Sequence, residues 1–91
     1  MAKKRDRLEI IYTILKLIQE HKNSIKITPL LRYSNISSQS FSEYYNDLLE
    51  KELIREVNEE RSGKYITLTD KGFKYLEKYQ YILGFINEFE L

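Results

Sequence analysis

Apolar residues recur at helical spacing through most of this 91-residue chain. The clearest stripe lies in the segment 35–54, where a spacing of three and four residues predicts a helix with one buried face. That face comprises Phe41, Tyr44, Tyr45 and Leu48, with Leu49 beside it. The polar residues of the opposite face are Ser38, Gln39, Ser42, Glu43 and Asn46. We therefore expect this segment to pack on one side and to form hydrogen bonds on the other.

The N-terminal pattern predicts a helix over residues 7–20. Asp6 supplies a capping oxygen, and Glu9 places an acid in the first turn. The apolar residues of this helix form more than one stripe, so it is either central to the domain or shared between the core and a partner chain. His21, the single histidine, falls at the expected helix end and is interpreted as a surface residue.

Between these two helices the pattern predicts a very short strand, 25–27, and a short helix, 29–34. Thr28 is the expected cap of the short helix. Pro29 would then take the first helical position, where its missing N–H costs nothing.

The turn 35–37 leads into the third helix. Asn35 is expected to adopt left-handed backbone geometry, because asparagine tolerates it better than most residues. Ser37 can cap the third helix, while Ser40 with Glu43 forms a competing capping box.

The second half of the chain predicts a hairpin followed by a long helix. Two extended segments, 53–58 and 64–68, are joined by a polar connection. A helix then runs over 70–89, with Thr69 as its cap.

Two lines of apolar residues run along the helix 70–89. One line can pack on the domain, so the other is expected to meet a partner helix. Gly84 either interrupts this helix or marks the close approach of another backbone. The expected dimer-interface residues are Tyr75, Leu76, Tyr79, Ile82, Leu83, Ile86 and Phe89.

The order helix, strand, helix, helix, hairpin, helix is that of a winged helix-turn-helix, a mainly α fold with a small β-hairpin. The third helix would be the recognition helix, and the hairpin would be the wing. We expect residues 1–68 to form the core and residues 69–91 to form a C-terminal dimerisation helix of the same single domain.

Composition and charge refine this picture. The absence of cysteine excludes disulfides and thiolate metal sites. The basic N-terminus precedes an amphipathic run, which is neither a signal peptide nor a membrane span, so a soluble cytoplasmic protein is expected.

The net charge of +1 hides an asymmetry along the chain. Residues 1–34 hold eight basic and three acidic residues, and residues 35–91 hold seven basic and eleven acidic residues. Attraction to nucleic acid should come mainly from the N-terminal third.

Catalysis has little support in the sequence. One histidine, no cysteine, no glycine-rich phosphate loop and no evident carboxylate pair leave no nucleophile and base to work together. We therefore expect no enzyme activity, no metal, no cofactor and no small-molecule substrate.

The chain resembles small archaeal winged-helix DNA-binding proteins, some of them chromatin-associated and others transcriptional regulators. The resemblance covers nearly the whole chain and rests on RLEIIYTIL, on NISSQSFSEYYNDLLEKELI, and on LTDKGFKYLEKY followed by FINEFEL. It implies a nucleoid-associated homodimer that is joined by the C-terminal helix and binds double-stranded DNA through the third helix and the wing.

The expected DNA-binding residues fall into three groups. On the third helix they are Ser37, Ser38, Gln39, Ser42, Glu43 and Asn46, and on the wing they are Arg61, Ser62 and Lys64. A third group, Lys3, Lys4, Arg5, Arg7 and Arg32, would add phosphate attraction or, at the terminus, form a solvated tail. The tyrosines of the helices are interpreted as core and interface residues in preference to a base-stacking platform.

Two features depart from the pattern of these relatives. Glu52 stands where they often place glycine, and acids outnumber basic residues in the segment 37–54. This acidity argues against tight, unspecific coating of DNA. It also leaves an alternative function, that of a protein-interaction module in a transcription or replication complex.

Overall fold

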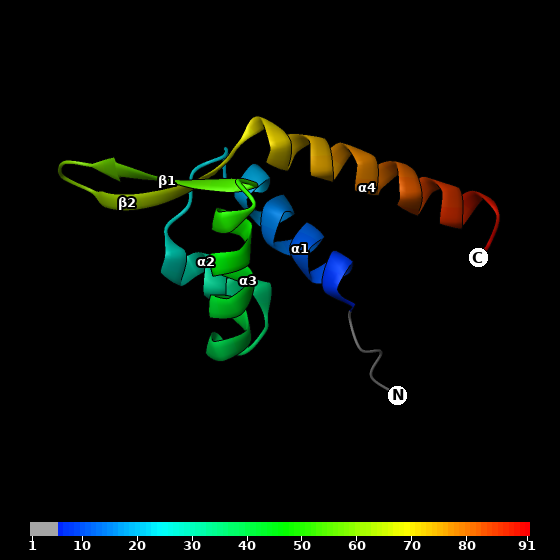
Figure 1. Ribbon diagram of the computed structural model, residues 1–91, viewed down its shortest axis with the longest axis horizontal. Coiled ribbons are helices and arrows are strands. Elements are labelled where there is room, and N and C mark those ends of the chain that lie inside the picture. Colours follow the sequence, from blue (N-terminus) through cyan, green and yellow to red (C-terminus); the bar gives the residue numbers. More distant parts are fainter. Residues whose placement is uncertain (1–5) are drawn as a thin grey trace.

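The computed structural model describes residues 6–91 and confirms the predicted winged helix-turn-helix (Figure 1). The helices are α1 (Arg7–Glu20), α2 (Ile27–Ser34), α3 (Ser38–Glu50) and α4 (Asp70–Glu88). The strands are β1 (Ile54–Glu59) and β2 (Gly63–Leu68), which form one antiparallel hairpin. The phosphate contacts predicted for Lys3, Lys4 and Arg5 lie outside the described residues.

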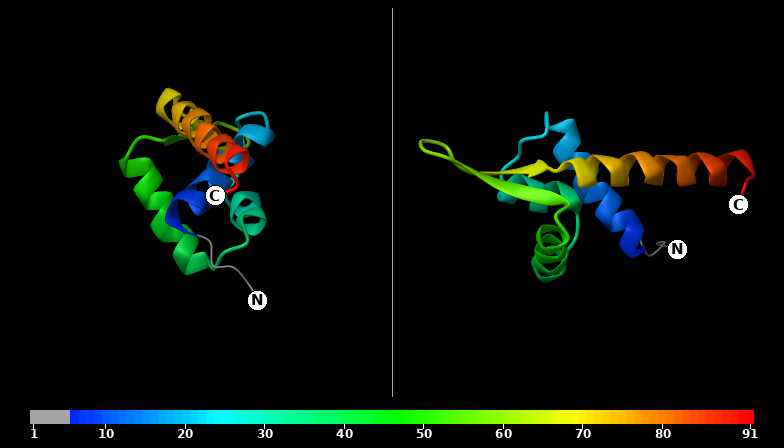
Figure 2. Two further views of the ribbon diagram at one scale, coloured as in Figure 1. Left: turned by 90° about the vertical axis from the view of Figure 1, so that its right-hand side faces the viewer. Right: turned by 45° about the horizontal axis from the view of Figure 1, so that its top comes forward.

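The first three helices form the body of the molecule, and two elements project from it. The tip of the hairpin and the C-terminal half of α4 extend in opposite directions (Figure 2). α3 lies on the side of the body away from α4, where its outer face is open to a partner.

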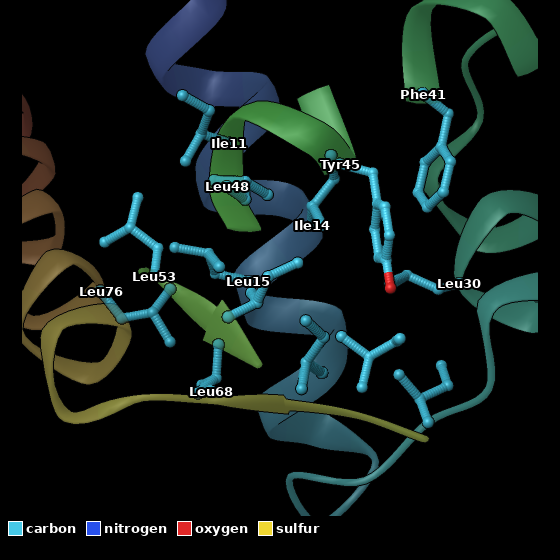
Figure 3. Packing of buried hydrophobic residues seen from close by; sticks show 14 residues of the cluster. Ile11, Ile14, Leu15, Leu30, Phe41, Tyr45, Leu48, Leu53, Leu68 and Leu76 are labelled. Atoms are coloured by element: carbon cyan, nitrogen blue, oxygen red, sulfur yellow. The ribbon is translucent and has the colours of Figure 1, made fainter. Parts of the chain in front are cut away.

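The core gathers apolar side chains from every helix and from the hairpin (Figure 3). Ile14, Leu15 and Ile18 of α1 are 0% exposed. α1 is therefore the central helix of the domain, which is the first of the two alternatives that its broad apolar surface left open. From α3 the core receives Phe41, Tyr45 and Leu48, as the stripe predicted, and Tyr44 is half-buried.

Three predicted helix caps are present. Asp6 accepts a hydrogen bond from the Glu9 N–H at 2.8 Å, and Ser37 accepts one from the Ser40 N–H at 3.1 Å. Thr69 caps α4 by accepting a hydrogen bond from the Gly72 N–H at 3.1 Å. Each bond satisfies a donor that the first helical turn leaves without an intrahelical partner. Ser37 therefore caps α3, and the competing capping box at Ser40 does not.

The predicted start of α2 is wrong by two residues. The helix begins at Ile27, its N-cap is Lys26, and no side chain caps it, so Thr28 is not the cap. Pro29 fits as the third helical residue, because every N–H of the first turn lacks an intrahelical acceptor. The predicted strand 25–27 shrinks to one bridge, in which Ile25 and Ile66 exchange backbone hydrogen bonds of 3.2 and 2.7 Å.

α3 ends in a Schellman motif. The Leu53 N–H donates to the Leu48 carbonyl at 2.9 Å, and the Glu52 N–H donates to the Leu49 carbonyl at 3.1 Å. Glu52 has a φ of 60°, the left-handed conformation that usually selects glycine at this position. Because Leu53 still closes the helix, β1 begins one residue later than predicted. Asn35, which ends α2, has a φ of 58°, as predicted.

The start of α4 presses against the end of α3. A Cβ on Gly72 would lie 2.3 Å from the Leu53 carbonyl oxygen, so only glycine permits this approach. The Thr69 N–H donates to the same carbonyl at 3.2 Å. At the other end, α4 continues unbroken past Gly84, where an added Cβ would have no neighbour within 4 Å among residues 6–91. The base of α4 is therefore fixed to the body, while its far end stands free.

Candidate nucleic acid interface

The outer face of α3 is a continuous polar ridge. Gln39, Glu43, Asn46 and Glu50 recur at intervals of four, three and four residues, and all are exposed. We call these four residues the α3 crest. Their spacing places them on one helical line, opposite the buried stripe. Within residues 6–91 no side-chain hydrogen bond or ion pair engages them. The amide and carboxylate groups of the crest are therefore not used in holding the described part of the chain together.

The remaining predicted residues of α3 flank this crest. Ser37 is exposed, and its Oγ is already engaged as the helix cap. Ser38 and Ser42 are exposed as well. Sequence reasoning therefore found the outward surface of α3, because a helical stripe of buried residues fixes the opposite face.

The wing residues predicted to contact DNA are all exposed. Arg61 and Ser62 lie in the turn between β1 and β2, and Lys64 is the second residue of β2. The Lys64 Nζ lies 3.3 Å from the Glu56 Oε2. Its charge is therefore partly neutralised inside the wing, which the sequence pattern did not indicate.

Glu56 connects the wing to α3. The hydroxyl of Tyr45, a core residue of α3, donates a hydrogen bond to the same Oε2 that faces Lys64. This hydrogen bond, aided by Lys64, lowers the pKa of Glu56 below its ordinary value. Burial, together with the neighbouring carboxylate, raises the pKa of Tyr45. Near neutral pH the pair is therefore a phenol donor and an ionised acceptor.

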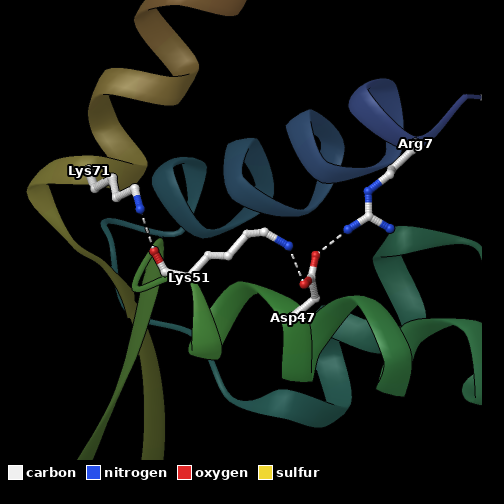
Figure 4. A network of polar contacts seen from close by, with 4 residues as sticks. All are labelled: Arg7, Asp47, Lys51 and Lys71. Carbon is white, nitrogen blue, oxygen red and sulfur yellow. Dashed lines mark hydrogen bonds and ion pairs between the residues drawn. The ribbon is translucent and has the colours of Figure 1, made fainter.

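Arg7, which was expected to attract phosphate, is engaged in an ion pair within the domain. Its guanidinium pairs with Asp47 of α3 (Figure 4). It also lies over the Tyr44 ring, 5.7 Å from the ring centre. Lys51 binds the other carboxylate oxygen of Asp47, and this hydrogen bond is the main reason that the pKa of Asp47 is lowered. Sequence reasoning missed Asp47, since nothing local reveals a partner 40 residues away.

The same network reaches α4. The Lys71 Nζ donates to the Lys51 carbonyl at 2.9 Å, so the end of α3 is linked to the start of α4 (Figure 4). Arg32 lies apart from these contacts. It is exposed at the end of α2, with its guanidinium 5.6 Å from the centre of the Tyr33 ring.

The predicted interface residues of α4 fall into two sets. Tyr75 and Tyr79 are half-buried against α1: the Tyr79 ring stacks on Tyr12 at 4.7 Å, and the Tyr75 hydroxyl donates to the Leu8 carbonyl at 3.0 Å. Burial raises the pKa of Tyr75 to about 12. Leu76 is 2% exposed. It is a core residue, so the prediction that it lies at a partner interface is wrong. It lies one turn beyond Gly72, on the side of α4 that packs against the body, so its side chain is directed inward.

The second set covers the free end of α4. Ile82 is 50% exposed, Phe85 57% and Phe89 58%. Ile86 is exposed and Leu83 half-buried. Three exposed residues of this end, Tyr81, Phe85 and Leu91, are not among the predicted interface residues. We call Tyr81, Ile82, Phe85, Ile86 and Phe89 the α4 apolar face. A contiguous exposed apolar face of this kind is typical of a surface that meets another protein.

Two structural features bear on other classes of function. None of the helices formed by residues 6–91 combines the length and hydrophobicity needed to cross a bilayer. In the same part of the chain, no group of three or more histidine, aspartate or glutamate side chains is arranged to hold a metal ion.

Comparison with solved structures supports the fold. The PcaV transcriptional regulator from Streptomyces coelicolor matches with a TM-score of 0.74 at 15% identity, over 87% of this chain and 59% of its own. F93 from STIV, described as a winged-helix DNA-binding protein, matches with a TM-score of 0.74 at 23% identity, over 88% of this chain and 91% of its own.

Comparison of sequences gives the family. An uncharacterized protein of Methanocaldococcus jannaschii is 35% identical over 83 residues, which are 91% of this chain and 36% of the relative. The chain thus spans about a third of the length of that relative. A family model described as winged helix-turn-helix matches residues 4–86. The chain therefore belongs to the winged helix-turn-helix family.

Proposed function

We propose that this protein binds double-stranded DNA as a homodimer and acts as a transcriptional regulator at the nucleoid. The observation that carries the proposal is the α3 crest, an exposed line of unengaged hydrogen-bonding groups on the helix that this fold presents to the major groove. PcaV is named a transcriptional regulator and F93 a DNA-binding protein, and both share this fold.

The crest has the chemistry for reading bases. Gln39 and Asn46 can each form a bidentate pair with an adenine edge. They are seven residues apart, which corresponds to about 10 Å along a helix and to roughly three base steps. Ser38 and Ser42 beside them can reach phosphates or bases. The crest supplies sequence preference, and Arg61, Lys64 and Arg32 supply phosphate attraction.

The α4 apolar face supports the proposed homodimer. Residues 69–91 act as the dimerisation helix of a single domain whose remainder, 1–68, reads DNA. Packing two copies of the face together would remove the exposed rings of Phe85 and Phe89 from water, which stabilises association by about 25 cal/mol per Å² of apolar surface. Two α3 helices would then address two half-sites.

The test is a fluorescence-anisotropy titration of a mixed-sequence duplex of about 30 base pairs at two salt concentrations, about 50 and 200 mM. Neutralisation of several phosphates predicts a loss of affinity of at least roughly tenfold between them. A selection from a random duplex library then gives the preferred site. Absence of binding at the lower salt concentration, together with no selected site, would reject DNA binding.

A protein-interaction module is the second candidate, and one observation favours it. The crest carries two carboxylates, Glu43 and Glu50, which repel phosphate and would suit a basic protein surface. The DNA titration separates the two candidates, because a module of this kind would leave the duplex unbound at either salt concentration.

A further inference from the structure

Glu56 occupies an unexpected place in the hairpin. Its strand partner is Ile66, which is 0% exposed, and Ile54 and Leu68 lie on the same face of the hairpin at 2% and 3%. Glu56 therefore carries a carboxylate on the face that packs against the helices, with 31% of its side chain exposed. A carboxylate at the edge of a core is costly unless charged or hydrogen-bonded partners compensate it.

The two partners of Glu56 come from different parts of the interface. Tyr45 belongs to α3, and its ring is held in the core, 6% exposed and stacked on Phe41 at 5.8 Å (Figure 3). Lys64 belongs to β2 and is one of the basic residues assigned to phosphate contact. One carboxylate oxygen thus joins a fixed point on the recognition helix to an exposed cation on the wing.

We propose that Glu56 is a positioning residue with two separable effects on DNA binding, a proposal that rests on the function proposed above. Through Tyr45 it anchors the wing to α3, and through Lys64 it withholds one positive charge from DNA until phosphate competes for that charge. The wing is therefore held in one orientation, and unspecific attraction to DNA is weakened.

The chain allows the two effects to be tested separately. In Glu56→Gln the side-chain carbonyl can still accept the Tyr45 hydrogen bond, but the charge that holds Lys64 is gone. In Tyr45→Phe the ring and the net charge remain, but the anchor is lost. Glu59→Gln is the matched control, because Glu59 lies on the same strand, is exposed, and makes no ion pair within the described residues.

The first measurement is binding of the mixed-sequence duplex across a salt series. Glu56→Gln should bind the duplex roughly fivefold more tightly at low salt. The slope of the logarithm of its binding constant against the logarithm of the salt concentration should be steeper by about one for each added phosphate contact. Tyr45→Phe and Glu59→Gln should keep the wild-type salt dependence. A Glu56→Gln protein with an unchanged dependence would overturn the release of Lys64.

The second measurement is ¹⁵N relaxation of the free proteins at the wing amides, residues 58–64. Tyr45→Phe should lower their order parameters from about 0.85 toward about 0.6, while Glu56→Gln and Glu59→Gln keep the wild-type values. Rigid wing amides in Tyr45→Phe would overturn the anchor. This measurement needs no DNA, so it tests the anchor even if the wild-type protein failed to bind the duplex and the proposed function fell.

Discussion

α3 and the free half of α4 are both amphipathic, but their outward faces differ in chemistry. The α3 crest is made of amides and carboxylates, whereas the α4 apolar face is made of isoleucine and aromatic side chains. The inward face of α3 follows from the needs of the core, and so does that of α4 near its base, where Gly72 and Leu76 are buried. The outward faces make no contribution to the core, and in the function proposed above they meet different partners, a hydrated DNA groove for α3 and a second copy of the helix for α4.

The largest expected effect comes from charging the α4 apolar face. Ile82→Glu with Phe85→Glu would place two carboxylates at the centre of the proposed dimer contact. A single change at such a position weakens the free energy of association by about 2–4 kcal/mol. Light scattering at micromolar concentration should then give the monomer mass of 11.0 kDa. Asn87→Glu, which places a carboxylate on the opposite side of α4, should leave the dimer intact. A wild-type protein that already has the monomer mass would refute the dimer.

The next effect concerns the α3 crest. Replacing Gln39 and Asn46 together with alanine removes both bidentate pairs, which are worth about 1–3 kcal/mol each. Competition binding should show the preference for the selected site falling roughly a hundredfold, while affinity for mixed-sequence DNA changes little. The matched control replaces Gln80 and Asn87, the same residue types on α4. An unaltered preference in the crest variant would show that other residues read the sequence.

A smaller effect contrasts the fixed and free ends of α4. Gly72→Ala pushes a methyl group against the Leu53 carbonyl and should lower the free energy of unfolding by about 1–3 kcal/mol. Gly84→Ala meets nothing within the described residues and should raise helix stability by about 1 kcal/mol. Thermal unfolding followed by circular dichroism measures both changes. If Gly84→Ala weakened the dimer instead, a partner backbone would approach at that point.

The smallest effect lies at the end of α3. Glu52→Gly should raise the free energy of unfolding by about 0.5–1 kcal/mol, because glycine adopts the left-handed conformation without a Cβ clash. Denaturant titration can resolve such a difference. Lys51→Gly, at a φ of −83°, is the control and should destabilise the protein. Equal effects of the two changes would mean that Glu52 carries no strain.

The fold could be predicted because its signals are local. The buried stripe of α3, the caps Asp6, Ser37 and Thr69, and the turn residue Asn35 are each recognisable within a few neighbouring positions. The start of α2 was predicted wrongly because proline is accepted throughout a first helical turn, so Pro29 marks the region of the start and not the residue.

The electrostatics of the candidate site could not be predicted because they depend on contacts distant in sequence. Arg7 was expected to be available to phosphate, and its pairing with Asp47 depends on how α1 lies across α3. Leu76 belongs to an apolar line that a wheel of α4 alone cannot divide between core and partner. The residues expected to bind DNA and those of the free α4 face stay predictions until the experiments above are done.

The contact of Gly72 with the Leu53 carbonyl fixes the base of α4 to the body. In the proposed dimer, the length of α4 would therefore set the distance between the two DNA-binding domains. Each residue inserted between the base of α4 and the apolar face would move one domain by about 1.5 Å and turn it by about 100°. Seven inserted residues would restore the orientation to within about 20° and separate the domains by about 10 Å. Insertions into α4 should therefore be tolerated only at lengths that restore the orientation of the two domains. Each tolerated insertion should also change the preferred spacing of the two half-sites on the duplex.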